Sequence, residues 1–230
     1  MTEVLPQTAP DRPLAGITVL AVEDSRLASE ALRLMCQRSG ARLRRADCLE
    51  VAHRHLSVYR PSVAIVDIGL PDGSGCDLIA ALSGARPRVP FILGTSGDTR
   101  LGPLALRAGA DGFLNKPVES LHAFQNCLTR GLRRGSVQVA RDGTPMTPDP
   151  LALRDDLHQA IYLLDRDSAD IPRDYIARFL HGLARCAHDD ILAEAALTLE
   201  QAQATDAGHA DDLQPLRRII RARLATVPAF

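Results

Sequence analysis

The strongest constraint on the fold is an alternation of short apolar runs with segments of helical periodicity through the first half of the chain. Most of these runs are β-branched and end at turn residues, so they predict buried strands. The strands are expected at residues 17–22, 42–46, 63–67, 89–94 and 112–114. The helices are expected at residues 25–38, 49–58, 74–82, 100–108 and 119–132. Strands that alternate with helices favour an α/β fold, in which a doubly wound parallel sheet is covered on both faces.

Polar and charged residues stand at or just after the ends of the predicted strands. They are Glu23 and Asp24 after the first strand, Asp67 at the end of the third, Thr95 after the fourth and Lys116 after the fifth. Right-handed crossovers bring the carboxyl ends of parallel strands to one edge of the sheet, where open α/β sheets bind ligands. We therefore expect these side chains to lie together. Asp67 taken alone could equally be a cap for the next helix.

Lys116 is the single lysine among 27 basic residues. A chain that otherwise uses arginine suggests, at this one place, a compact ammonium group rather than a planar guanidinium. Clustered carboxylates raise one another's pKa unless a cation neutralises them, and hard ions such as Mg²⁺ prefer oxygen ligands. A carboxylate beside Mg²⁺ can attack a phosphoryl group, whose oxygens a lysine and a hydroxyl can stabilise. The set therefore predicts a Mg²⁺-assisted phosphoryl site.

This ordered set resembles the receiver domain of bacterial two-component response regulators, over roughly residues 15–132. The matching positions are Glu23-Asp24, Asp67, Pro71, Gly75, Thr95 and Lys116-Pro117. The segment 108–117, Ala-Gly-Ala-Asp-Gly-Phe-Leu-Asn-Lys-Pro, is similar to the family's approach to its Lys-Pro pair. The resemblance implies a flavodoxin-like fold of five strand–helix units, (βα)5. It also implies a phosphorelay signalling protein rather than an enzyme that acts on other molecules.

The same resemblance implies a role for each residue of the predicted site. Asp67 would accept a phosphoryl group from a phosphohistidine on a sensor histidine kinase or a histidine phosphotransfer protein. Asp24, Asp67 and the backbone carbonyl of Gly69 would bind Mg²⁺, with Glu23 acting mainly through a water. Lys116 would pair with the phosphoryl oxygens. The chain would catalyse only its own phosphorylation and dephosphorylation.

A conformational switch and a cis peptide bond are also implied by the resemblance. Thr95 would move toward the phosphoryl group and release space for Phe113, and the bond from Lys116 to Pro117 would be cis. Phe113 also has a plain interpretation as a half-buried strand aromatic, and Thr95 has one as a helix cap. Glu23 stands where many family members have aspartate, which we expect to tune the metal geometry without abolishing binding.

Outside the strand–helix region, the sequence predicts a tail, a linker and a helical domain. We expect a flexible tail at residues 1–14, a linker rich in glycine and proline at 133–149, and a helical domain at 150–230. Apolar residues at helical spacing predict amphipathic helices at about residues 150–165, 172–187, 189–204 and 211–226. Four helices joined by short polar loops favour an antiparallel bundle.

The two parts of the chain carry opposite net charge. Residues 1–144 contain 18 basic and 14 acidic residues, whereas residues 145–230 contain 9 and 14. Affinity for DNA depends on neutralising phosphates, so an acidic bundle without a basic recognition helix is a poor DNA binder. We therefore expect a protein partner, possible homodimerisation included, rather than DNA. The five scattered cysteines suggest a cytoplasmic protein, and no apolar run is long enough to predict a membrane span.

His181 raises a more specific hypothesis for the bundle. Histidine phosphotransfer domains are four-helix bundles with an exposed histidine, and His181 lies off the apolar stripe of its predicted helix. The chain would then be a phosphorelay intermediate. However, Ala184 and Arg185 stand where that family's pattern requires lysine and glycine, so a solvated surface histidine is the simpler interpretation. A further alternative is a phosphate-independent scaffold with a vestigial acidic site.

Overall fold

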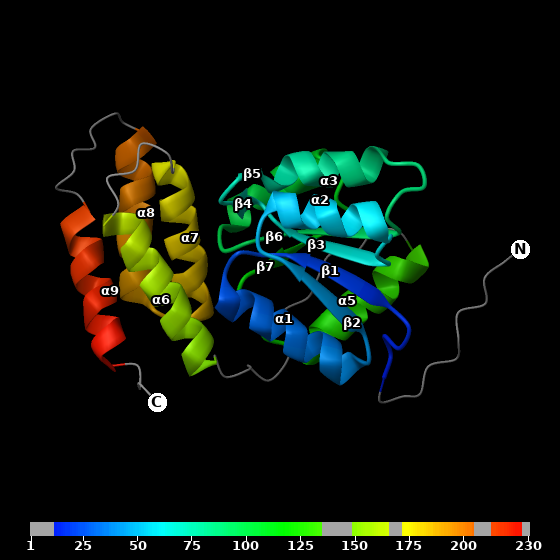
Figure 1. Ribbon diagram of the computed structural model, residues 1–230, viewed down its shortest axis with the longest axis horizontal. Helices are drawn as coiled ribbons and strands as arrows, with labels where there is room; N and C mark the ends of the chain where they lie inside the picture. The colour runs from blue at the N-terminus through cyan, green and yellow to red at the C-terminus, as the bar shows by residue number, and fades with distance from the viewer. Residues whose placement is uncertain (1–11, 135–148, 166–171, 205–212, 227–230) are drawn as a thin grey trace, which may run out of the picture.

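A five-stranded parallel sheet forms the centre of the N-terminal part of the protein (Figure 1). The computed structural model describes residues 12–134, 149–165, 172–204 and 213–226. The strands are β1 (Thr18–Val22), β2 (Arg42–Ala46), β3 (Val63–Asp67), β6 (Phe91–Ser96) and β7 (Gly112–Asn115). They lie in the order β2-β1-β3-β6-β7. The chain therefore winds outward in both directions from β1 and β3, which confirms the expected doubly wound α/β fold.

Helices cover both faces of this sheet (Figure 1). They are α1 (Arg26–Ser39), α2 (Leu49–Val58), α3 (Gly75–Gly84), α4 (Gly102–Arg107) and α5 (Leu121–Arg134), with a 3₁₀ turn η1 (Thr99–Leu101) before α4. One hydrophobic core lies under α1 and α5, and a second lies under α2, α3 and α4. Successive strand residues alternate between the cores, so Ile65 belongs to the first and Val66 to the second.

The fourth strand of the sheet, β6, begins later than expected. The sequence predicted residues 89–94, but the strand covers Phe91–Ser96. Pro90 has no backbone N–H to donate to a neighbouring strand, so regular pairing starts after it. The shift places Thr95 inside the strand, paired with Leu114 of β7, rather than in the loop that follows.

Two further boundaries differ from the expected ones. The tail expected at residues 1–14 is too long, because Leu14 is buried and its N–H donates to the carbonyl of Ser39 at 2.9 Å. The loop expected after β3 contains a small antiparallel pair, β4 (Gly69–Leu70) and β5 (Gly73–Ser74). Most of the expected tail and linker, residues 1–11 and 135–148, lies outside the described residues.

Four helices form a separate bundle in the second part of the chain. They are α6 (Pro150–Asp165), α7 (Arg173–Cys186), α8 (Asp190–Ala204) and α9 (Gln214–Thr226). Both α6 and α8 pack against α7 and α9, which closes a ring around a common core. Leu157, Leu180, Leu183 and Ile220 lie in that core and are almost fully buried. The expected helical bundle is confirmed, and none of the described helices is long and apolar enough to cross a membrane.

The bundle lies against the carboxyl edge of the sheet, so the two parts are in contact (Figure 1). Helices α6 and α7 contact α1, and α7 also contacts β4. Leu27 and Ala28, in the first turn of α1, belong to the hydrophobic cluster of the bundle rather than to either core of the sheet. The second part of the chain therefore returns to cover the edge at which the strands end.

Candidate functional site

Five polar side chains from the ends of four strands meet at this edge of the sheet. Glu23 and Asp24 follow β1, Asp67 ends β3, Thr95 lies near the end of β6 and Lys116 follows β7. Carboxylate oxygens of Glu23, Asp24 and Asp67 all lie within 4.8 Å of one another. All five side chains are buried. The structure thus brings together the set that the sequence placed at separate strand ends.

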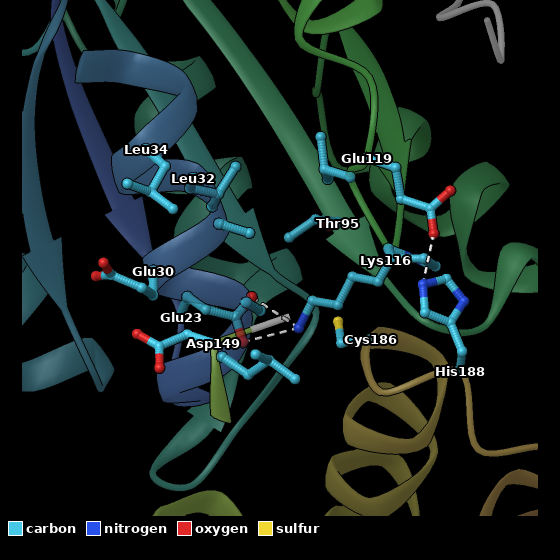
Figure 2. A pocket seen from close by; sticks show the side chains of 15 residues that line it. Glu23, Glu30, Leu32, Leu34, Thr95, Lys116, Glu119, Asp149, Cys186 and His188 are labelled. Atoms are coloured by element: carbon cyan, nitrogen blue, oxygen red, sulfur yellow. Dashed lines mark hydrogen bonds and ion pairs between the residues drawn. The ribbon is translucent and has the colours of Figure 1, made fainter. Parts of the chain in front are cut away.

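Lys116 joins two of the three carboxylates (Figure 2). Its Nζ lies 2.5 Å from Oδ2 of Asp67 and 2.7 Å from Oε2 of Glu23, and Figure 2 shows the ammonium group pointing toward Glu23. Burial alone would lower the pKa of Lys116, but the charges of Asp67 and Glu23 outweigh burial and raise it. Lys116 is therefore held as a cation, and a single positive charge faces three carboxyl groups.

Two carboxyl groups of the cluster hold protons more tightly than usual. Burial, reinforced by the neighbouring charge of Asp67, raises the pKa of Asp24 to about 7. Burial also raises the pKa of Glu23 well above its ordinary value, although Lys116 opposes the shift. Burial thus disfavours the charged forms of both groups, and the carboxylates add to this effect by repelling one another. A second cation would relieve that repulsion.

The donor set fits Mg²⁺. Three carboxylates within reach of one point supply only hard oxygen ligands, which Mg²⁺ prefers over nitrogen or sulfur. The ion would be held by Asp24, Asp67 and Glu23. The backbone of Gly69, two residues after Asp67, would hold it as well. The N–H of Gly69 donates to Oδ1 of Asp67 at 3.2 Å, so the loop already folds back on this carboxylate.

The loop after Asp67 is held close by a glycine. The N–H of Gly75 donates to the carbonyl of Ile68 at 3.0 Å. A Cβ atom at Gly75 would lie 1.8 Å from the backbone oxygen of Asp67, so no other residue fits here without moving the strand end. This contact gives a physical reason for a glycine eight residues after the aspartate.

Thr95 lies on β6 and Phe113 on the neighbouring edge strand β7. The hydroxyl of Thr95 donates to the carbonyl of Leu114 at 2.9 Å. The Phe113 ring is half-buried and packs against Gly94 and Gly102, where added Cβ atoms would lie 3.2 Å and 3.3 Å from it. The Lys116–Pro117 peptide bond is cis, the isomer that the resemblance implied.

The helical bundle adds side chains to the site that the sequence did not reveal. The hydroxyl of Tyr175 donates to Oδ2 of Asp24 at 2.6 Å. Arg178 lies against Gly69, and together they line a pocket with Asp67 and Lys116. Cys186 lines a second pocket beside Lys116 and is drawn next to it in Figure 2. A buried tyrosine usually needs a partner for its hydroxyl, but nothing in the sequence indicates which partner.

Asp156 of α6 makes a second buried contact between the parts, and the sequence did not reveal it either. Its carboxylate accepts hydrogen bonds from the Ser25 hydroxyl at 2.8 Å and from the N–H groups of Arg26 and Leu27 at 2.8 Å and 2.9 Å. These are unpaired donors at the N-terminus of α1, where a negative charge is favourable. Asp156 therefore caps a helix 130 residues away in the sequence.

His181 lies to one side of the acidic cluster. Its neighbours include Asp98 and Glu200, and burial lowers its pKa. Gly182 of α7 instead lies beside Lys116, since an added Cβ there would lie 3.9 Å from Nζ. His181 does not line the pocket that contains Asp67. The structure therefore does not bring this candidate together with the five-residue set.

Part of the chain is similar to known proteins. Residues 19–126 match the family model described as "Response regulator receiver domain". The chain is 30% identical over 146 residues to the probable transcriptional regulatory protein TcrX of Mycobacterium tuberculosis, a match that covers 63% of this chain and 62% of TcrX. It is 32% identical over 133 residues to the KDP operon transcriptional regulatory protein KdpE of Escherichia coli, covering 58% and 56%. The chain thus spans less than two thirds of the length of these curated relatives.

A solved structure with a similar fold is the receiver domain of the sensor histidine kinase PA1611 from Pseudomonas aeruginosa PAO1, described with a magnesium ion coordinated in its active site cleft. It is 28% identical, covers 52% of this chain and 99% of its own, and gives a TM-score of 0.45.

Residues 19–126, just under half of the chain, are thus similar to the receiver domains of the response regulator family. The helical bundle lies beyond the residues that the family model matches. The relatives are named as transcriptional regulators, so the expectation that DNA is not a partner is not confirmed.

Proposed function

We propose that this protein is a two-component response regulator that accepts a phosphoryl group on Asp67 from a phosphohistidine of a histidine kinase or a phosphotransfer protein. The observation that carries the proposal is the 2.5 Å ion pair between Asp67 and Lys116 inside a buried cluster of carboxylates. A buried carboxylate that already touches a cation at a ligand-binding edge is placed for nucleophilic attack. The same ammonium is placed to receive the oxygens of the incoming group.

The transfer forms one bond as another breaks. An oxygen of Asp67 attacks phosphorus, and the P–N bond to the donor imidazole breaks, with its electron pair going to the imidazole nitrogen. Lys116 then pairs with a phosphoryl oxygen instead of with the bare carboxylate. Mg²⁺, when bound by Asp24, Asp67 and Gly69 with Glu23 acting through water, supplies positive charge to the phosphoryl oxygens. The protein acts in this way only on itself, through its own phosphorylation and dephosphorylation.

The switch that follows uses Thr95 and Phe113. The Thr95 hydroxyl leaves the Leu114 carbonyl and donates to a phosphoryl oxygen. The movement frees space beside the Phe113 ring, which packs against Gly94 and Gly102. Phosphorylation thereby shifts the population between two arrangements of β6 and β7.

We divide the chain into a receiver domain at residues 15–132, a linker at 133–149 and a helical domain at 150–230. The helical domain transmits the signal to a protein, which can be a second copy of the chain. The support for this output is apolar surface on the bundle, where Leu151, Tyr162 and Ile191 are each more than half exposed.

Phosphorylation of the wild type and of Asp67→Asn tests the function. The two proteins are incubated with a small acyl phosphate, with and without Mg²⁺, and intact mass is measured. We expect a Mg²⁺-dependent gain of one phosphoryl group in the wild type and no gain in Asp67→Asn. An equal gain in the variant would assign the phosphoryl group to another residue, and no gain in the wild type would contradict the function.

A further inference from the structure

We propose that the α6–α7 face of the bundle is an intramolecular lid over the phosphoacceptor, which a phosphodonor and Mg²⁺ must displace. This inference rests on the proposed function of Asp67. The α6–α7 face is defined by Asp156, Tyr175, Arg178, Gly182 and Cys186, which contact the receiver edge. The lid and the donor protein compete for the same surface of the receiver.

The first support for a lid is that the reactive groups are covered. Only 7% of Asp67 and 6% of Lys116 is exposed. Across Gly97, in the loop after β6, α7 approaches so closely that a Cβ atom there would lie 3.0 Å from Cα of Gly182. A phosphohistidine on another protein has to bring its phosphorus within bonding distance of Asp67. With α7 in this position, no protein donor can reach the carboxylate.

The second support is that Tyr175 occupies a metal-binding oxygen. Its hydroxyl is hydrogen-bonded to Oδ2 of Asp24 at 2.6 Å, and Asp24 is one of the carboxylates expected to hold Mg²⁺. A cation bound through Oδ2 would compete with the tyrosine hydroxyl for the lone pairs of that oxygen. Binding of Mg²⁺ therefore opposes this contact of α7, and by reciprocity the docked bundle weakens binding of Mg²⁺.

The third support is that the contacts suit a reversible interface. All the hydrogen bonds of the Asp156 carboxylate go to the receiver, from Ser25, Arg26 and Leu27. The outer contacts are ion pairs, from Arg26 to Asp155 at 2.7 Å and from Arg100 to Glu200 at 3.2 Å. Water can replace such partners when the parts separate. Leu27 and Ala28 of α1 also belong to the hydrophobic cluster of the bundle, so separation exposes some apolar surface there as well. Interfaces of this partly polar kind are typical of parts that move relative to each other.

Cys186 provides a readout of separation that does not depend on phosphorylation. It is 9% exposed and lies beside Lys116, and burial raises the pKa of its thiol to about 12, so it alkylates slowly while the bundle is docked. Cys36 and Cys127 lie inside the sheet domain and serve as internal controls that stay protected. Peptide mapping after iodoacetamide treatment measures each cysteine separately.

The experiment compares the full-length wild type with Asp156→Ala and with Asp165→Ala. Asp156→Ala removes the hydrogen bonds to α1, whereas Asp165→Ala removes the same charge from the same helix but loses contacts only with Arg217 and Arg221 of α9. In Asp156→Ala we expect Cys186 alkylation and the rate of phosphorylation by a small acyl phosphate to rise about tenfold, because apparent affinity scales with the open fraction. Asp165→Ala should behave as the wild type.

A size series at Gly182 gives a second, independent test. An alanine Cβ would lie 3.9 Å from Lys116 Nζ and fits under the docked lid, whereas leucine in Gly182→Leu reaches the lysine and forces α7 away. Gly182→Ala should keep Cys186 protected, and Gly182→Leu should expose it. Addition of Mg²⁺ with fluoroberyllate, a phosphoryl mimic, should also expose Cys186 in the wild type.

The outcomes separate the lid from the function on which it rests. If Asp156→Ala and Gly182→Leu alkylate and phosphorylate at the wild-type rate, the lid is wrong and the function of Asp67 stands. If both variants expose Cys186 and no protein gains phosphate, the phosphoacceptor function is wrong. Faster phosphorylation that accompanies exposure of Cys186 in both variants, and in neither control, establishes the lid.

Discussion

The protein buries acidic side chains at two places, and they are satisfied in different ways. At the sheet edge, Glu23 and Asp67 share one ammonium group and Asp24 lies beside them, so three carboxyl groups are clustered around one positive charge. At the start of α1, the single carboxylate of Asp156 accepts hydrogen bonds from a hydroxyl and two backbone N–H groups. The carboxylate cluster at the sheet edge can bind a further cation, whereas the Asp156 carboxylate already has its hydrogen-bond donors. The comparison shows how a reactive site and a structural contact differ when both consist of buried carboxylates.

The largest effect is expected on removal of the one cation at the sheet edge. Lys116→Met removes the ammonium group that pairs with Asp67 and Glu23, and breaking a buried ion pair costs about 3–5 kcal/mol of unfolding free energy. Urea unfolding at neutral pH measures this loss. Saturating Mg²⁺ should restore part of it. A loss below about 1 kcal/mol would show that the cluster carries less charge than we infer.

The sheet edge should also make stability fall as pH rises through neutrality in the metal-free protein. The pKa of Asp24 is about 7 in the folded protein, above its ordinary value, so the stabilising proton is bound at low pH and lost as pH rises through 7. The slope is at most about 1.4 kcal/mol per pH unit for one group. Urea unfolding between pH 5 and 8 measures it. Asp24→Asn should flatten the curve, and an unchanged slope in that variant would exclude Asp24 as its source.

Neutralising a single aspartate should change the free energy of unfolding in opposite directions at the two places. Asp67→Asn relieves repulsion within the cluster, and Lys116 keeps Glu23 as a partner, so we expect a gain of about 1 kcal/mol. Asp156→Asn weakens charge-assisted hydrogen bonds and should lose about 1–2 kcal/mol. Thermal unfolding of both variants at one pH gives the comparison. Losses of equal size would remove the distinction between the two kinds of site.

The smallest effect is expected inside the bundle. Asp189 is hydrogen-bonded to Arg223 at 2.5 Å, and this contact lowers the pKa of Asp189. Its stabilisation is therefore present at neutral pH and lost as pH falls below about 4, opposite in direction to that of Asp24. Asp189→Asn should cost less than about 1 kcal/mol, because Arg223 is more than one third exposed. Unfolding at pH 7 and pH 3 tests this, and Asp190→Asn, one residue along the chain, serves as the control.

Much of the receiver could be predicted from the sequence because its signals are local. Strand and helix periodicity gave the order of elements, and parallel topology alone was sufficient to bring Asp67 and Lys116 to one edge. The start of β6 was misplaced because Pro90 belongs to the apolar run yet cannot pair. The role of each site residue remains a prediction that the phosphorylation experiment tests.

The docking of the bundle could not be predicted, because it depends on contacts between distant surfaces. Asp156 looks like any acidic residue on a polar helix face until the N-terminus of α1 is placed against it. Tyr175 looks like an ordinary core aromatic until its hydroxyl meets Asp24. The position of His181 could not be predicted either, since α7 places Gly182 beside Lys116, and a phosphotransfer role for His181 remains a prediction.

The backbone contact between Gly97 and Gly182, at which neither residue has a side chain, has an evolutionary consequence. Replacing Gly182 changes how firmly the two parts associate, yet it adds no group to the reaction and leaves both cores of the sheet untouched. Under the proposed lid, the threshold for phosphorylation would therefore drift, or be selected, by single substitutions at a position that takes no part in the chemistry. Sensitivity can be adjusted in small steps, and no intermediate form has to lose its fold.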